Sequence, residues 1–246
     1  MIKHLELKRK NNKILRGYLT DAKDSEIIVV FFHGFTGNKT EHAGHFRNFS
    51  RILFNNNISS VRFDYFGNGE SDGEFKDFTF DTLIEDSEQI IEYVRVNYNN
   101  KRIVLLGFSM GGAVAAMMAA KHPEIDKIIL WSPAGNIIEH IKKYYEDLPK
   151  NNNNNVIIGG FFELSKEMYD SLQNYDTYRD FNKYPGKVLI IQGEKDLTVK
   201  PDISKKYMDL AMHSNYIMIN NAGHGYDKID ERDILYSESL KYLKER

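Results

Sequence analysis

The chain has 246 residues, of which 41% are apolar and 28% are charged, a size and composition that predict one globular domain with a sizeable core. A formal net charge of -2 gives no indication of nucleic acid or an anionic membrane as a partner. The absence of cysteine excludes a disulfide framework, a thiol nucleophile and a thiolate metal site.

The N-terminal segment predicts an antiparallel hairpin at the edge of a sheet, with strands at residues 2–9 and 14–19 separated by Asn11 and Asn12. This segment alternates apolar and charged residues and lacks the apolar core of a secretory signal. Nowhere in the chain is an apolar run long enough to cross a bilayer. We therefore expect a cytoplasmic protein.

Short apolar runs alternate with helix-like segments along most of the remaining chain. The predicted strands cover residues 27–32, 58–63, 103–106, 127–131, 187–192 and 216–219. The predicted helices cover residues 42–54, 80–98, 111–120, 201–212 and 233–244. This alternation predicts an α/β fold with a mainly parallel sheet covered by helices on both faces. Ligands of such sheets bind at the carboxyl ends of the strands.

The alternation is interrupted between residues 132 and 184. About fifty residues separate two predicted strands there, which is too long for a single crossover connection. We therefore expect one domain over residues 1–246 with an inserted lid subdomain at residues 133–184, lying above the strand ends.

The motif GFSMG at residues 107–111 stands between an apolar strand and an alanine-rich helix. Its two glycines permit the tight strand-to-helix turn that holds a serine hydroxyl out at the carboxyl end of a sheet. A G-x-S-x-G match alone is a weak signal, but this context strengthens it. The sequence predicts that Ser109 is a nucleophile, and the alternative is a structural turn.

A serine hydroxyl needs a base within hydrogen-bond reach and an acid that orients the base. The strand at residues 187–192 is followed by Gly193-Glu194-Lys195-Asp196. Asp196 is the predicted acid. Glu194, close to the strand end, and Asp202, at the start of the next helix, are the alternatives.

His224 is the predicted base, in a loop after the strand at residues 216–219. Among the eight histidines only His213 and His224 follow Asp196, and His213 falls within a helical pattern. The glycines on both sides of His224 suit a loop tip that approaches the serine.

The loop HGFTGN at residues 33–38 follows the strand at residues 27–32. The backbone amides of Phe35 and Met110 are the predicted oxyanion hole. We expect His33 to be structural, bonded to neighbouring loops. His42 and His45 have a spacing that could suggest metal ligation, but no carboxylate pattern accompanies them, so we expect an exposed helix start.

The order Ser109, Asp196, His224 after HGFTGN resembles the α/β-hydrolase family over nearly the whole chain. The loop DYFGNGESDGEF, the acidic helix that contains Asp86 and the segment GGFFELSKEMYD resemble more narrowly the bacterial cinnamoyl (feruloyl) esterases. The resemblance implies an α/β-hydrolase fold, no metal or organic cofactor, and a small insert that roofs the active site and holds an aromatic acyl group. The insert departs from the pattern, because residues 136–155 are rich in Lys and Asn and residues 161–162 lack a phenolic hydroxyl. A broader acyl specificity is therefore an alternative.

Aromatic residues of the insert are candidates for an apolar acyl pocket, with simple packing of the insert as the alternative for most of them. Phe161, Phe162 and Tyr169 are the predicted substrate-binding residues, because they follow Gly159-Gly160, a predicted turn over the site.

These observations predict a serine ester hydrolase that forms an acyl-enzyme, and the resemblance implies aromatic, hydroxycinnamoyl-type or short acyl esters as substrates. Its expected partner is a small-molecule ester, with no nucleic acid or membrane. The alternatives are a thioesterase, an acylglycerol lipase, an acyltransferase, a small-peptide hydrolase, or a non-catalytic ligand-binding protein of the same architecture. The oligomeric state, a homodimer included, stays open.

Overall fold

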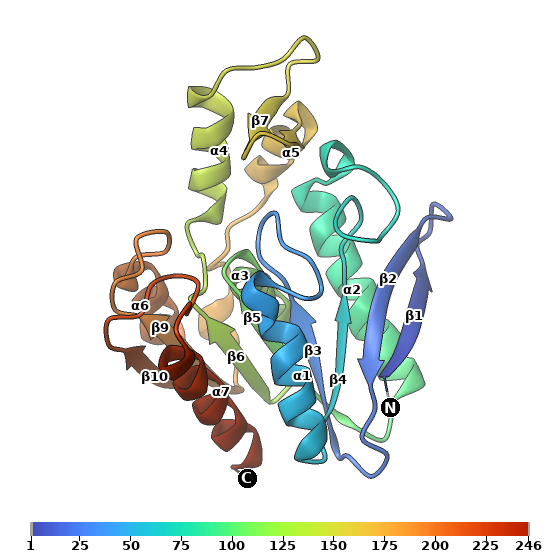
Figure 1. Cartoon of the computed structure of the whole chain (residues 1–246), viewed down its shortest axis with the longest axis vertical. Coiled ribbons are helices and arrows are strands. Elements are labelled where there is room, and N and C mark those ends of the chain that lie inside the picture. The colour runs from blue at the N-terminus through green and yellow to red at the C-terminus, as the bar shows by residue number, and fades with distance from the viewer. Residues whose placement is uncertain (1, 246) are drawn as a thin grey trace.

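The computed structural model describes residues 2–245 and places eight strands in one sheet, in the order β1-β2-β4-β3-β5-β6-β9-β10 (Figure 1). They are β1 (Ile2–Lys8), β2 (Ile14–Thr20), β3 (Ile27–Phe32), β4 (Ser59–Phe63), β5 (Arg102–Phe108), β6 (Lys127–Trp131), β9 (Lys187–Gly193) and β10 (His213–Ile219). The hairpin β1-β2 is antiparallel and pairs antiparallel with β4, whereas every pairing from β4 to β10 is parallel. The predicted α/β fold with a mainly parallel sheet is confirmed.

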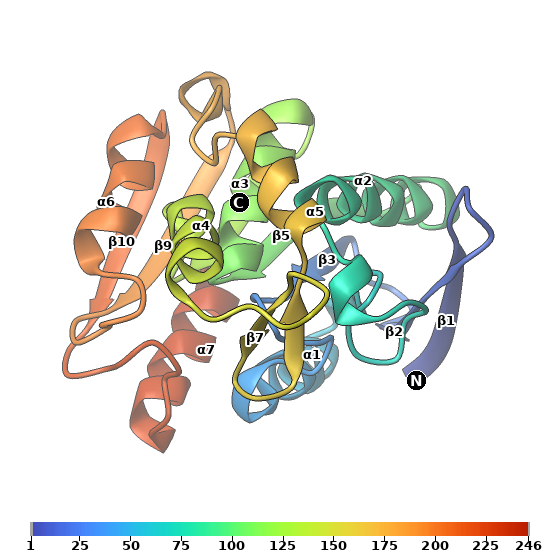
Figure 2. The same ribbon diagram turned by 90° about the horizontal axis from the view of Figure 1, so that it is seen from above.

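Helices cover both faces of the sheet (Figure 2). They are α1 (His45–Asn55), α2 (Phe80–Asn97), α3 (Met110–Lys121), α6 (Pro201–Leu210) and α7 (Ile229–Lys244). Alternate residues of β3 belong to two separate apolar clusters, Val29 and Phe31 with α1 and α7, and Val30 and Phe32 with α2 and α3. This explains why β3 reads as a continuous apolar run, since a strand buried on both faces has no polar side.

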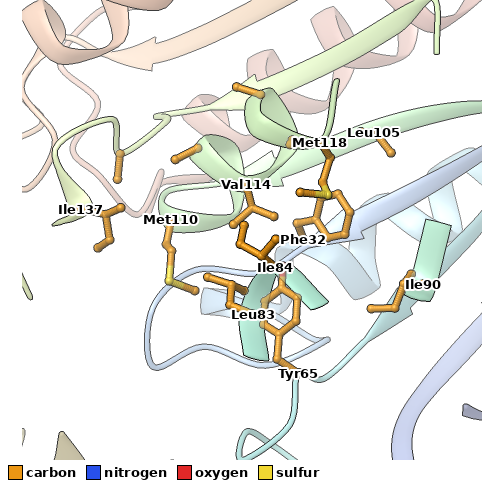
Figure 3. Close-up of a cluster of buried hydrophobic side chains, with 14 of the residues drawn as sticks. Phe32, Tyr65, Leu83, Ile84, Ile90, Leu105, Met110, Val114, Met118 and Ile137 are labelled. Carbon is orange, nitrogen blue, oxygen red and sulfur yellow. The ribbon is translucent and has the colours of Figure 1, made fainter. Parts of the chain in front are cut away.

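The apolar cluster between the sheet and helices α2 and α3 fixes the position of α3, the helix that follows Ser109. In Figure 3 side chains of the sheet meet side chains of both helices: Phe32, Leu105, Leu83, Ile84, Val114 and Met118. These side chains are all buried. Their close packing gives α3 a defined position relative to the strand ends.

Glycine is required where α3 passes β3. A Cβ on Gly111 would lie 1.8 Å from the carbonyl oxygen of Phe32, and a Cβ on Gly107 would lie 1.9 Å from the carbonyl oxygen of Gly111. Both distances are far below van der Waals contact. The two glycines of the GFSMG motif therefore serve helix packing as well as the turn.

Between β6 and β9 the chain forms α4 (Ile137–Asp147), a hairpin of β7 (Val156–Ile158) and β8 (Phe162–Leu164), and α5 (Lys166–Ser171). These elements stand above the carboxyl ends of the strands (Figures 1 and 2). The Phe80 amide donates to Ser171 Oγ at 3.0 Å, which ties the insert to the start of α2. The division into a core domain and a lid subdomain stays a prediction.

The C-terminal elements begin earlier than the sequence indicated. β10 starts at His213 instead of residue 216, so the expected placement of His213 in a helix is wrong, and α7 starts at Ile229 instead of residue 233. β10 is an edge strand whose first half is polar and mostly exposed, which weakens the apolar signal. Within residues 2–245 no helix combines the length and the apolarity needed to span a bilayer.

Candidate active site

Ser109 occupies a strained turn between β5 and α3. Its backbone has φ 55° and ψ -120°, a conformation with positive φ that a residue with a Cβ adopts only when its surroundings enforce it. Backbone hydrogen bonds on both sides of the residue do so. The Ser109 amide donates to Trp131 O at 2.9 Å, and its carbonyl accepts from the amides of Gly112 and Ala134, both at 2.9 Å. The hydroxyl is thereby held at the carboxyl end of the sheet.

His224 lies between Ser109 and Asp196. Its Nε2 is 3.0 Å from Ser109 Oγ, and its Nδ1 is 2.7 Å from Asp196 Oδ2. Because a carboxylate only accepts hydrogen bonds, Nδ1 carries the proton and Nε2 is free to accept the hydroxyl proton of Ser109. The ring packs on Phe108, with 5.0 Å between centroids, which fixes its plane.

Asp196 is buried, and both of its oxygens accept hydrogen bonds. Oδ1 accepts from the amides of Thr198 at 3.0 Å and Val199 at 2.7 Å. Oδ2 accepts from Gln192 Nε2 at 3.1 Å in addition to His224. Four donors around one carboxylate compensate for its burial and fix its orientation.

The two alternative acids are engaged elsewhere. Glu194 Oε2 accepts from the amide of Asn221 at 2.8 Å, which tightens the loop before His224. Asp202 lies in the first turn of α6, as the sequence indicated, where a negative charge favours the helix N-terminus. The structure thus brings together Ser109, Asp196 and His224.

The amide of Phe35 is oriented by hydrogen bonds to the preceding peptide carbonyl. Gly34 O accepts from the Gly37 amide at 3.0 Å and from His33 Nδ1 at 2.9 Å. In a trans peptide the N–H points away from the carbonyl, so the Phe35 amide faces away from both donors. Phe35 lines the cavity over Ser109. Met110 opens α3, where an amide has no carbonyl one turn earlier to bind. The oxyanion-hole role of both amides stays a prediction.

His33 is buried and neutral. Its Nε2 accepts from the amide of Tyr65 at 3.3 Å while Nδ1 donates to Gly34 O. Burial lowers the pKa of His33, which is consistent with this single-proton arrangement. His33 therefore holds two loops together at the edge of the site, which is the structural role expected for it.

The cavity above Ser109 has a volume of about 570 Å³. The insert contributes Ile137, His140, Tyr144 and Ile158 to its lining, and loops of the core contribute Glu41, His42 and Asp227. The sequence analysis included Tyr144 only among the aromatic residues of the insert and did not consider Ile137, His140 or Ile158. A signal was present, because positions 137, 140 and 144 share one face of a helix.

The three predicted substrate-binding residues lie outside the lining of this cavity. Phe161 is 74% exposed, and Phe162 packs on Phe75 with 4.7 Å between ring centroids. The hydroxyl of Tyr169 donates to Glu146 at 2.7 Å. Their contact with a substrate stays a prediction.

His45 is buried, so the expectation of an exposed helix start is wrong for this residue. Its Nε2 donates to Gly225 O at 2.7 Å, and its Nδ1 accepts from the Tyr236 hydroxyl at 2.6 Å. Burial lowers the pKa of His45. His45 is buried because α1 packs against the loop after His224.

His42 is half-exposed and lies 2.6 Å from Asp227 Oδ1. Among residues 2–245 no group of three or more His, Cys, Asp or Glu side chains has the arrangement of a metal site.

Known proteins match this chain in sequence and in fold. The AB hydrolase superfamily protein YisY of Bacillus subtilis is 24% identical over 236 residues, covering 80% of this chain and 84% of YisY. Est1E from Butyrivibrio proteoclasticus, in a structure with ferulic acid bound, superposes with a TM-score of 0.86 at 22% identity, covering 97% of both chains. An esterase of Pyrococcus furiosus superposes with a TM-score of 0.75 at 20% identity, covering 99% of this chain and 90% of the esterase.

These similarities confirm the α/β-hydrolase fold, and the likeness to Est1E agrees in fold with the narrower resemblance. The family described as serine aminopeptidase, S33, matches residues 23–152, which is more than half of the chain. The chain therefore belongs to the serine aminopeptidase S33 family and is a hydrolase of the α/β fold.

Proposed function

We propose that this protein hydrolyses carboxylic esters through an acyl-enzyme formed on Ser109. The observation that carries the proposal is the continuous hydrogen-bonded chain from Ser109 through His224 to Asp196, at a cavity. A nucleophile, a base and an orienting acid within hydrogen-bond reach of one another are what acyl transfer to serine requires.

In the first half of the reaction Ser109 Oγ attacks the ester carbonyl carbon while His224 Nε2 takes the hydroxyl proton. The imidazolium is stabilised by Asp196 through Nδ1. As the tetrahedral intermediate collapses, the bond from carbon to the alcohol oxygen breaks, and His224 returns the proton to the leaving alcohol. The acyl group remains on Ser109.

In the second half a water molecule attacks the acyl carbon, and His224 takes its proton. The bond to Ser109 Oγ breaks, the proton returns to Oγ, and the carboxylic acid leaves. In both halves the negative charge forms on the carbonyl oxygen, which the amides of Phe35 and Met110 receive. Each such donor contributes about 3 kcal/mol to transition-state stabilisation.

The substrates that fit best are aromatic, hydroxycinnamoyl-type or short acyl esters. The volume of about 570 Å³ is in the range that holds a small organic ligand. Ile137 and Ile158 offer apolar contact to an acyl group, and His140 and Tyr144 offer polar atoms to a ring substituent. The ferulic acid bound to Est1E, a protein of similar fold, supports the aromatic alternative. The cytoplasmic location stays a prediction, and the oligomeric state stays open.

The proposal is tested by ester turnover. Wild type should hydrolyse p-nitrophenyl butyrate, and Ser109→Ala should remain folded while kcat falls by about 10³-fold or more. Undiminished turnover by Ser109→Ala would refute the proposal. Methyl ferulate compared with simple aliphatic methyl esters tests the acyl preference, and equal rates would count against a hydroxycinnamoyl substrate.

Because the matching family is described as serine aminopeptidase, a peptide-like substrate should be tested beside the esters. An aminoacyl p-nitroanilide placed beside the matching aminoacyl ester tests hydrolysis of an amide bond directly. We expect the ester to be the better substrate. Faster cleavage of the anilide would move the assignment to an aminopeptidase with the same three residues.

A further inference from the structure

The carboxylate of Glu41 is bound to the loop that carries Phe35. Its Oε2 accepts from the Gly34 amide at 2.6 Å, and its Oε1 accepts from the His42 amide at 2.9 Å. The loop passes close to the carboxylate, since a Cβ on Gly37 would lie 3.2 Å from both oxygens. Glu41 therefore connects residue 34 with residue 42 across the turn between β3 and α1.

The backbone of Glu41 is strained. Its φ of 64° and ψ of 167° are unusual for a residue with a side chain, and Ala43 also has a positive φ, of 49°. Such a conformation costs about 1–3 kcal/mol and persists where neighbouring contacts enforce it, often at functional sites. Here the strain accompanies a carboxylate aimed back at Gly34.

Gly34 lies between Glu41 and the nucleophile. A Cβ on Gly34 would be 3.4 Å from Ser109 Cβ and 3.6 Å from Glu41 Oε2. Its amide is held by Glu41, and its carbonyl is held by His33 and Gly37. With both polar groups of Gly34 bound, the orientation of the next amide, that of Phe35, is determined.

We propose that Glu41 is a positioning residue that directs the Phe35 amide toward the developing oxyanion by holding the amide of Gly34, an inference that rests on the proposed ester hydrolysis. Glu41 makes no covalent bond and transfers no proton in this role. It acts before the reaction, by fixing a donor where charge appears only in the transition state.

The charge of Glu41 is compatible with this role. Burial raises the pKa of Glu41, and its hydrogen bonds with the amides of Gly34 and His42 oppose that shift. Two backbone donors on the two oxygens offset part of the negative charge close to the site. The carboxylate can therefore brace the loop without leaving an unpaired charge beside the oxyanion.

The test compares Glu41→Ala and Glu41→Gln with wild type. A donor displaced by about 1 Å lowers the rate about 10- to 100-fold, so kcat for p-nitrophenyl butyrate should fall by that factor in Glu41→Ala while KM stays within about twofold. Glu41→Gln should be intermediate, because its amide oxygen can accept from Gly34 while its amide nitrogen faces the second donor.

A second readout distinguishes positioning from general loosening of the fold. Phenylboronic acid forms a tetrahedral adduct with an active serine and imitates the oxyanion, so its inhibition constant should rise by the same factor as kcat falls. Glu88→Gln is the matched control. Glu88 lies on α2, and its carboxylate binds Lys121 and His122 at the C-terminal end of α3, the end remote from Ser109. This variant should leave kcat and the inhibition constant unchanged.

The outcomes separate this inference from the proposed function. If both Glu41 variants keep kcat and boronic acid affinity within about twofold of wild type, Glu41 does not position the donor. A rise in KM at constant kcat would assign Glu41 to substrate binding and also overturn the inference. If Glu41→Ala does not fold, Glu41→Gln decides alone. If wild type hydrolyses no ester, the proposed function fails before any variant is compared, and the inference fails with it.

Discussion

Nδ1 of His224 lies 2.7 Å from Oδ2 of Asp196, although the two residues follow different strands and are 28 positions apart in the chain. β9 and β10 are parallel neighbours, so the loops at their carboxyl ends meet at one edge of the sheet. Gln192 and the amides of Thr198 and Val199 hold the carboxylate in place. The ring of His224 is therefore oriented by a group that is itself fixed.

Asp196→Asn should retain the fold but lose most of the turnover. The amide that replaces the carboxylate can present N–H to Nδ1, which favours the tautomer with its proton on Nε2, unable to accept from Ser109. We expect kcat to fall by about 10³- to 10⁴-fold, as for comparable triads. Steady-state kinetics and thermal unfolding of the same samples measure this. A kcat within tenfold of wild type would mean that Asp196 does not orient the base.

Gly111→Ala should destabilise the protein strongly, because the added methyl would lie 1.8 Å from the carbonyl oxygen of Phe32. Backbone atoms cannot move aside at low cost, so we expect a loss of more than about 3 kcal/mol in the free energy of unfolding. Urea denaturation measures it. Gly223→Ala is the control for stability, since a Cβ there meets no atom within 4 Å. Equal stability of the two variants would contradict the packing described for α3.

The sequence alone predicted the sheet, most helices and the three residues that meet at the strand ends. The reason is that buried parallel strands are continuous apolar runs. In addition, the turn at residues 107–111 is so crowded that only glycine fits at its first and last positions, which produces a motif that can be recognised in the sequence. Parallel topology then places later loops beside this turn. Asp196 and His224 could be selected from their loops without knowledge of any distance.

The pocket and the surroundings of the site could not be predicted in the same way. Contacts such as that between His45 and Gly225 O depend on how α1 packs against a loop 180 residues later. The early start of β10 was missed because the first half of an edge strand is polar. The insert lines the cavity with one face of α4, and its orientation depends on tertiary packing that composition does not reveal.

Ile158→Ala and Phe161→Ala should differ in their effect on acyl specificity. Ile158 lines the cavity, whereas Phe161 on the same hairpin is 74% exposed and lies outside the lining. Loss of apolar contact in a pocket costs about 1–3 kcal/mol, so kcat/KM for aromatic or butyryl esters should fall about tenfold or more in Ile158→Ala and stay near wild type in Phe161→Ala. The reverse result would support the prediction made from the sequence for Phe161.

The ion pair between His122 and Glu88 should make stability depend on pH. His122 Nε2 lies 2.6 Å from Glu88 Oε2. Hydrogen bonding to Glu88 raises the pKa of His122, and hydrogen bonding to His122 lowers the pKa of Glu88 to about 2. The contribution of His122 to folding stability is complete below its pKa in the unfolded chain, near 6.5, and is lost as pH rises through its pKa in the folded protein. The contribution of Glu88 is present above its unfolded pKa of about 4.5 and is lost as pH falls through its pKa in the folded protein.

His122→Gln should therefore be less stable than wild type near pH 5.5, by less than about 1 kcal/mol because both side chains are partly exposed. The difference should shrink toward pH 9, as wild-type His122 loses its proton. Urea unfolding of both proteins at the two pH values measures it. A difference that is the same at both pH values would show that the charge of His122 contributes nothing.

Reaction of the folded wild-type protein with a fluorophosphonate tests the central claim most directly, because this reagent labels a serine only when a base has activated it. We predict one adduct per chain by intact-mass spectrometry, located at Ser109 by peptide mapping and reduced in rate in Asp196→Asn. A folded protein that takes up no label, or that carries the label on another residue, would contradict the assignment of Ser109 as the nucleophile.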